Sequence, residues 1–241
     1  MQQRYGMRAH DWASLLAMAG GAAVVVALLR GRLVWALLWG AVTLAAGMAA
    51  RTWSRRNPGP MPYALRWTLY LIPHAPSQLK KLLEPVKGEH ILEIGPGVGH
   101  HALAVAGALA PGGVLDVLDV QQEMLDAVLR RAHAAGISNI SARQGTAHEL
   151  PYPDGAFDGA YLSAVLGEIP DQAQALRELR RVLRPNGRLV VTEGILDPDY
   201  VPFAALRELA ARAGFVFERK LGPGFAYMAR FRAAEPLSSR G

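Results

Sequence analysis

The sequence predicts an α/β fold, with a doubly wound, mostly parallel seven-stranded sheet that is preceded by an N-terminal transmembrane helical hairpin. After residue 79, short runs rich in β-branched and aromatic residues alternate with longer helical runs, which is typical of a parallel sheet covered on both faces. A glycine-rich loop follows the first of these runs. Two apolar runs near the N-terminus predict the hairpin.

The apolar runs, 12–29 and 33–50, contain no charged residue. Each has roughly 18 residues, or about 27 Å of helix, which is within the range of a spanning helix. Arg30-Gly31-Arg32 suits the turn between them, and further arginines lie outside both runs. By the positive-inside rule, both ends are expected in the cytoplasm. We therefore expect residues 1–56 to anchor the chain in the cell membrane. A cleaved signal peptide, a soluble hairpin and a re-entrant hairpin are the alternatives.

The charge distribution opposes nucleic-acid binding. Residues 1–56 hold seven arginines and one acidic residue, so they account for the whole net charge of +6. Residues 57–241 carry 19 basic and 19 acidic side chains, and this balance provides no basic face for a nucleic acid. The sequence has no cysteine, which excludes disulfides, thiolate zinc ligands and cysteine nucleophiles. No metal site is predicted.

Prolines mark residues 57–77 as a linker. Its middle, 63–72, is aromatic and apolar, and either lies in the membrane interface or forms a helix packed across the following domain. We expect that domain to cover residues 78–232. The polar stretch 233–241 is expected to be a flexible tail.

Within the domain, the last two strands are expected to pair antiparallel. The strands are expected at 90–94, 114–119, 139–144, 157–162, 188–193, 215–220 and 226–232, and the helices at 99–110, 122–135, 172–183 and 201–213. In a doubly wound domain the ligand lies at the carboxyl ends of the strands.

The loop after the first strand reads Gly95-Pro96-Gly97-Val98-Gly99 and leads into a helix. Glycine tolerates positive φ and lets the backbone approach a ligand, and a helix start offers free N–H groups. A dinucleotide site has a similar loop, but its usual G-x-G-x-x-G pattern needs glycine where this sequence has His100. Asp119 ends the second strand, about 24 residues after Gly95, where a carboxylate can accept both hydroxyls of a ribose.

Four motifs follow one another along the domain: LEIGPGVG, LDVLDVQQEML, QGTAHELPYPDGAFDGAYLSAVLGEIPD and ELRRVLRPNGRLVVTEG. In this order they resemble class I S-adenosylmethionine-dependent methyltransferases over roughly residues 78–232. Within that superfamily the chain is most similar to the bacterial group that includes ubiquinone/menaquinone C-methyltransferases and phospholipid N-methyltransferases. The resemblance implies the class I methyltransferase fold and S-adenosylmethionine as the cofactor.

The resemblance also implies which residues hold the methionine part of the donor. Gly95, Gly97 and Gly99 would pass under it, and Ser163 would lie beside it. Glu93 would order the loop or reach the amino group of the donor through a water molecule.

The nucleoside part of the donor would be held by residues of the next two loops. The resemblance implies that Asp119 holds the ribose and that Val120 and Gln121 border the adenine. Thr146 and Ala147 stand where many relatives have an acidic residue followed by alanine. Since a hydroxyl or a backbone group must replace that acid, we expect a weaker contact to the adenine amino group.

A sulfonium is already an activated methyl donor, so the domain chiefly has to align the acceptor and exclude water. A base is optional for an amine acceptor and more useful for an enol or phenol carbon acceptor. Glu168, which follows the fourth strand, is the candidate base, and His100 and His101 come next. The alternative for each of these three residues is a non-catalytic place at the start of a helix or on the surface.

The anchor favours a lipophilic acceptor at the cytoplasmic face of the lipid bilayer, such as a phospholipid amine or a quinone precursor. A tethered methyltransferase of a soluble small molecule is the alternative. An NAD-linked oxidoreductase is less favoured because the third glycine of its usual loop is missing. A non-catalytic binding scaffold is also less favoured, because only Thr146 indicates a changed donor pocket. The sequence identifies neither the acceptor nor the oligomeric state.

Overall fold

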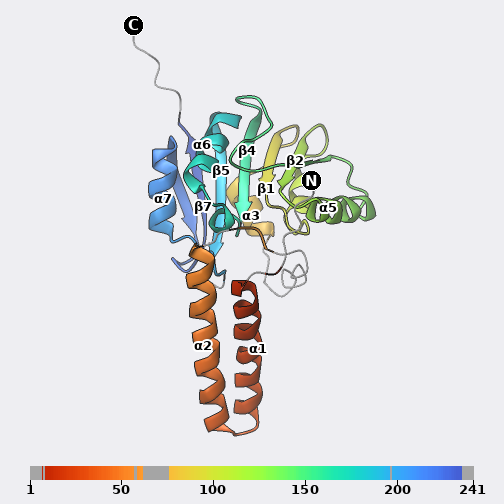
Figure 1. Ribbon diagram of the computed structural model, residues 1–241. Coiled ribbons are helices and arrows are strands. Elements are labelled where there is room, and N and C mark those ends of the chain that lie inside the picture. The colour runs from red at the N-terminus through yellow and green to blue at the C-terminus, as the bar shows by residue number, and fades with distance from the viewer. Residues whose placement is uncertain (1–6, 8, 57–58, 62–75, 196, 235–241) are drawn as a thin grey trace.

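The computed structural model describes residues 7, 9–56, 59–61, 76–195 and 197–234. An α/β domain lies at one end of the molecule, and a long helical hairpin projects from it (Figure 1). The strands are β1 (His90–Ile94), β2 (Val114–Asp119), β3 (Ile140–Gln144), β4 (Phe157–Ser163), β5 (Leu183–Gly194), β6 (Phe215–Leu221) and β7 (Ala226–Ala233).

The strands form one seven-stranded sheet in the order β3-β2-β1-β4-β5-β7-β6. The first five in this order are parallel, whereas β7 runs antiparallel to both β5 and β6. The expectation of a mostly parallel seven-stranded sheet is therefore confirmed. Chain order reverses beside β1, which pairs with β2 on one side and with β4 on the other. Loops diverge at such a switch point, and a ligand crevice forms at the carboxyl ends of the strands.

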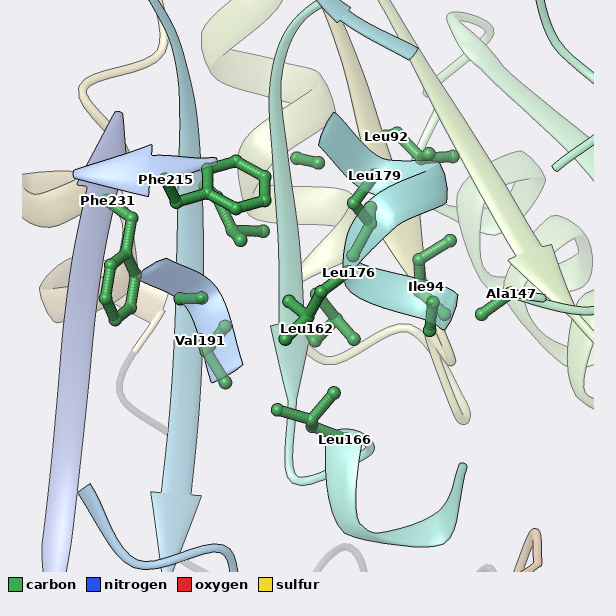
Figure 2. Close-up of a cluster of buried hydrophobic side chains, with 14 of the residues drawn as sticks. Leu92, Ile94, Ala147, Leu162, Leu166, Leu176, Leu179, Val191, Phe215 and Phe231 are labelled. Carbon is green, nitrogen blue, oxygen red and sulfur yellow. The ribbon is translucent and has the colours of Figure 1, made fainter. Parts of the chain in front are cut away.

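Helices cover both faces of the sheet. The α/β domain contains α3 (Pro76–Leu83), α4 (Ala102–Leu109), α5 (Gln122–Ala134), the short 3₁₀ helix η2 (Leu166–Glu168), α6 (Gln172–Val182) and α7 (Phe203–Arg212). Side chains alternate between two cores along β1, where Ile91 packs with α3, α4 and α5 and Leu92 packs with α6 and α7. Figure 2 shows part of the second core, in which Leu176 and Leu179 of α6 lie near the strand residue Leu162.

Most element boundaries lie within two residues of the sequence-based expectations, and three differences are larger. Helix α4 begins at Ala102 rather than at 99, because Gly99 has φ +82, outside the right-handed helical region. The sequence predicts no helix at α3 and places its first two residues in the linker, whereas Leu79, Leu82 and Leu83 bury one face of it. Strand β5 begins at Leu183 rather than at 188, where it pairs with the first residue of β4.

The hairpin consists of α1 (Ala9–Leu29) and α2 (Leu33–Arg56). The two helices approach closely at Gly20, where an added Cβ would lie 2.4 Å from the Thr43 hydroxyl oxygen. Most of their large apolar side chains are exposed. Asp11–Leu29 and Leu33–Thr52 are long and apolar enough to cross a membrane, which makes the helices candidates for membrane spans by length and composition.

The hairpin meets the α/β domain at the carboxyl edge of the sheet. Near the end of α2, the Arg51 guanidinium donates to the carbonyl oxygen of Ile195 at 3.5 Å and lies 5.4 Å from the ring centroid of Tyr200. Ile195 directly follows β5. The predicted interfacial segment 63–72 and residues 235–241 of the predicted tail lie outside the described residues.

Candidate active site

A cavity of about 1370 Å³ lies at the carboxyl edge of the sheet. Its wall comes chiefly from the loops after β1, β2, β3, β4 and β5, together with residues 59–61 and the β6–β7 turn. Pockets for one small molecule commonly measure about 300–1,000 Å³. The cavity therefore has room for two ligands side by side.

The glycine loop forms the part of the wall that follows β1. Gly95 has φ +65, and its N–H donates to the carbonyl oxygen of Leu118 at 2.8 Å. A Cβ at Gly95 would lie 2.5 Å from a methyl carbon of Val165, so this position requires glycine. Gly97 also has positive φ and lines the cavity. Gly99 instead faces Leu103 and lies outside the cavity wall.

Asp119 stands in the wall at the end of β2. Its Oδ1 accepts a hydrogen bond from the backbone N–H of Gln121 at 2.9 Å. Burial raises the pKa of Asp119 to about 7, against the backbone N–H groups of Gln121 and Val120, which lower it. The backbone thus fixes the carboxylate at the cavity edge.

Gln121 is 4% exposed and lines the same part of the cavity. Its Nε2 donates to the carbonyl oxygen of Met61 at 2.8 Å, which links the cavity wall to the described part of the linker. Its Oε1 is buried and has no hydrogen-bond partner among the described residues. A buried acceptor of this kind is uncommon in folded proteins and is suited to a ligand donor.

Glu168 lies across the cavity on η2, and its Oε2 accepts from the backbone N–H of Met61 at 3.3 Å. Burial raises its pKa well above the ordinary range, and the carboxylates of Asp197 and Asp199 raise it further. Gly167 permits this arrangement, because a Cβ there would lie 1.8 Å from the carbonyl oxygen of Asp199. The close approach of the backbones at Gly167 and Asp199 therefore brings Glu168 near the acidic residues that follow β5.

Glu193, the penultimate residue of β5, lies in the same wall and is 5% exposed. Its Oε2 accepts from the backbone N–H of Val201 at 3.1 Å, whereas Oε1 has no hydrogen-bond partner among the described residues. Burial raises the pKa of Glu193 to about 8, and Asp197 and Asp199 contribute. Burial likewise raises the pKa of Asp197 to about 7, and Arg51 opposes that shift.

A chain of polar side chains connects the glycine loop with β4 and β5. His101 is buried, and its Nε2 lies 3.3 Å from the hydroxyl oxygen of Ser163. The Thr192 hydroxyl donates to the same oxygen at 2.8 Å. All three residues line the cavity, whereas His100 does not.

Residues 92–191 match the family model of the methyltransferase domain. This part of the chain is therefore a methyltransferase domain, and the relatives and solved structures described below support the class I S-adenosylmethionine-dependent superfamily. The resemblance seen in the four sequence motifs is therefore confirmed, and the match implies S-adenosylmethionine as the cofactor.

Curated relatives match part of the chain. A demethylmenaquinone methyltransferase from Listeria welshimeri is 34% identical over 109 residues, which cover 45% of this chain and 46% of the Listeria protein. An uncharacterized 37.1 kDa protein in transposon TN4556 of Streptomyces fradiae is 40% identical over 118 residues, or 49% of this chain and 32% of that protein. The chain thus spans less than half the length of these relatives.

Solved structures share the fold of the methyltransferase domain. An S-adenosylmethionine-dependent methyltransferase from Aquifex aeolicus gives a TM-score of 0.67 at 18% identity, covering 73% of this chain and 100% of that chain. The [4+2]-cyclase SpnF gives 0.59 at 20% identity, covering 66% and 79%. Since a cyclase has this fold as well, the fold alone does not specify the reaction.

Most residues that the sequence assigned to the site line one cavity in the methyltransferase domain. They are Gly95, Gly97, Asp119, Val120, Gln121, Thr146, Ala147, Ser163 and Glu168. Glu93 and Gly99 do not line it. The Glu93 side chain is buried in the sheet, where its Oε2 accepts from the Tyr161 hydroxyl at 2.7 Å and burial raises its pKa to about 8. That position fits the loop-ordering role expected of Glu93 better than contact with the donor.

Sequence reasoning missed several wall residues. Glu193 is the penultimate residue of β5 and Asp197 follows that strand, and their position at the end of a parallel strand was the signal that could have found them. Met61 and Phe225 carried no such signal, because the linker and the β6–β7 turn reach the cavity only through the tertiary fold.

Proposed function

We propose that this protein transfers a methyl group from S-adenosylmethionine to a lipophilic acceptor at the cytoplasmic face of the cell membrane. The position of the cavity carries the proposal. The cavity and the apolar hairpin lie at the same edge of the sheet, so an anchored domain turns the cavity toward the lipid bilayer.

The wall near β1 and β2 fits the donor. Gly95 and Gly97 leave backbone free beside the methionine part, and the Asp119 carboxylate suits the ribose hydroxyls. Gln121 Oε1 is a buried acceptor that suits the adenine amino group. It would replace the acid that is absent at the exposed Thr146. When bound, S-adenosylmethionine supplies an activated methyl group on a sulfonium.

The opposite side of the cavity suits an apolar acceptor. Ile195, Leu221 and Phe225 line it, and all three are exposed, Phe225 by 59%. Tyr200, whose ring Arg51 of the hairpin covers, donates its hydroxyl to the carbonyl oxygen of Gly224. These contacts connect the end of α2 to the turn that carries Phe225. Exposed apolar side chains beside a membrane anchor favour contact with the interface of the bilayer.

The residues around the acceptor provide alignment, water exclusion and a place for a proton. Glu168, the candidate base of the sequence, lines the cavity, and so does His101, whose ring contacts Ser163. The name of the Listeria relative, a demethylmenaquinone methyltransferase, supports a lipophilic acceptor. Both ends of the hairpin would then lie on the cytoplasmic side, where the donor is made.

Membranes that contain the full chain test this proposal with S-adenosylmethionine labelled on its methyl group. We expect label in the organic phase after solvent partition, and its loss in Asp119→Ala. Asp126→Ala is the matched control, because Asp126 is exposed on α5 and outside the cavity wall. Label found only in the aqueous phase would contradict a lipophilic acceptor and favour a soluble one.

A further inference from the structure

We infer that the acceptor group is an amine that enters the cavity as an ammonium cation, and that Glu193 holds this cation and takes its proton. The inference rests on the proposed function, because it names the acceptor class of the same cavity. It concerns the side of the cavity formed by η2, the end of β5 and the residues that follow β5.

The charge of the wall is the first observation. Asp119, Glu168, Glu193 and Asp197 line the cavity, and no lysine or arginine lines it among the described residues. Asp119 stands at the donor side. The other three carboxyl groups remain for the acceptor side, and a phenolate or carboxylate acceptor would meet them without a compensating cation. Carboxylates in the cavity wall would repel a negatively charged acceptor, whereas they would attract an ammonium cation.

The unpartnered oxygen of Glu193 is the second, independent observation. The residue is 5% exposed, and Val201 satisfies only Oε2. A buried carboxyl oxygen without a hydrogen bond costs free energy in the folded protein. An ammonium is a donor of three hydrogen bonds and a cation, so it satisfies both the unpaired oxygen and the charge.

The surroundings of Glu193 determine its protonation. Asp197 and Asp199 follow β5, and Tyr227 of β7 pairs with Glu193 in the sheet. Glu168 lies on η2, and Arg51 of α2 faces Asp197. Because burial and the two aspartates raise the pKa of Glu193 to about 8, Glu193 is mostly protonated at pH 7 until a cation arrives. Binding of an ammonium lowers that pKa, and the carboxyl proton is released to solvent.

The resulting carboxylate of Glu193 then accepts the proton that the ammonium must lose before methyl transfer. An ammonium N–H proton passes to Oε1 of Glu193, which frees the nitrogen lone pair. The lone pair forms the new N–C bond while the S–C bond of the sulfonium breaks, and the electron pair of that bond stays on sulfur. The products are a methylammonium cation, formed directly because the neutral amine gains a methyl cation, a neutral thioether, and a carboxyl group at Glu193 that releases its proton to solvent.

Defined acceptors test the amine, with the full chain and labelled S-adenosylmethionine. One set of phosphatidylcholine vesicles contains phosphatidylethanolamine, a second contains a quinol, and a third arm offers phosphoethanolamine in solution. We expect transfer to phosphatidylethanolamine and none to the quinol. Transfer to the quinol alone would overturn the amine and leave the lipophilic acceptor standing. Transfer to phosphoethanolamine alone would keep the amine and overturn the lipid source, and no transfer in any arm would overturn both proposals.

Glu193→Gln tests the role of the carboxylate against Glu208→Gln, whose side chain is exposed on α7 and pairs only with Arg212 among the described residues. We expect kcat for the amine to fall by about 100-fold or more in the first variant alone, with the dissociation constant of S-adenosylmethionine unchanged. Equal weakening of donor binding would show that Glu193 serves the sulfonium and would overturn the inference.

Proton release gives a readout that does not depend on turnover. Calorimetric titration of the full chain with phosphatidylethanolamine vesicles, in two buffers of different ionisation enthalpy, measures the protons released on binding. Near pH 7 we expect release with the wild type and with Glu208→Gln, and its loss with Glu193→Gln. Equal release in all three proteins would contradict the assignment of the ammonium to Glu193.

Discussion

Replacement of Glu193 by glutamine should make the folded protein more stable at high pH, because glutamine avoids the burial of a charge. The carboxyl is 5% exposed, and burial raises its pKa from 4.5 to about 8. Between these two values the folded protein holds a proton at Glu193 that the unfolded chain has lost. Wild-type stability therefore falls as pH rises through this interval, and the contribution is fully lost above about pH 8.

The size of this effect follows from the same two values. Each tenfold change in a protonation equilibrium corresponds to about 1.36 kcal/mol, so the interval from 4.5 to about 8 amounts to roughly 5 kcal/mol at most. Glutamine keeps an oxygen that can accept from the Val201 N–H and does not titrate. In a domain of this size, we expect the difference in melting temperature, variant minus wild type, to be roughly 10 °C larger at about pH 9 than at about pH 5.

Thermal unfolding of the detergent-solubilised full chain, followed by circular dichroism at several pH values, measures this difference. Other buried carboxyls titrate in both proteins, so their contributions cancel in the comparison. Glu208→Gln should show no such pH dependence, because that side chain is exposed. A melting difference between Glu193→Gln and wild type that stays constant with pH would refute the reasoning.

Three further predictions concern the anchor, the glycine loop and the donor site. Leu44→Arg, in the candidate span Leu33–Thr52, should cost about 2.5–3.5 kcal/mol of insertion free energy and reduce the fraction of protein found in the membrane. Leu129→Arg on α5 is the control and should leave this fraction unchanged. Equal membrane fractions for the two variants would contradict a spanning α2. Gly95→Ala should lower the free energy of unfolding by about 1–2 kcal/mol and weaken donor binding, because Gly95 has φ +65 and an added Cβ would meet Val165. An unchanged melting temperature would argue against this geometry. Asp119→Asn should weaken S-adenosylmethionine binding roughly 10- to 100-fold. It should also abolish a rise in wild-type affinity through about pH 7, since the ribose hydroxyls bind the carboxylate form; calorimetry that shows no such rise would contradict this role.

Strands β1, β2 and β4 could be predicted because they are mostly buried and leave short, largely apolar runs in the sequence. The bounds of β1 and β2 are those expected, and Asp119 ends β2 where the ribose ligand was predicted. Helix α3 was not recognised as an element, because its short amphipathic pattern follows a proline-rich segment. Local pattern thus determined the strands better than the short helices.

The acceptor side of the site could not be predicted, because it depends on contacts between distant segments. Glu193 becomes a buried acid only when Val201 and the residues after β5 fold over it. Gln121 and Glu168 are joined through Met61, which the sequence places in a linker. Residue types alone do not reveal such approaches.

An experimental structure of the full chain with S-adenosylhomocysteine would test most directly whether the cavity holds a donor and an acceptor together. We expect the ribose hydroxyls on Asp119 and the sulfur on the side of Glu168 and Glu193. Open space should then continue from the sulfur to Phe225 at the hairpin side. A ribose bound away from Asp119, or a sulfur that faces away from Glu168 and Glu193, would contradict the proposed transfer to a membrane acceptor.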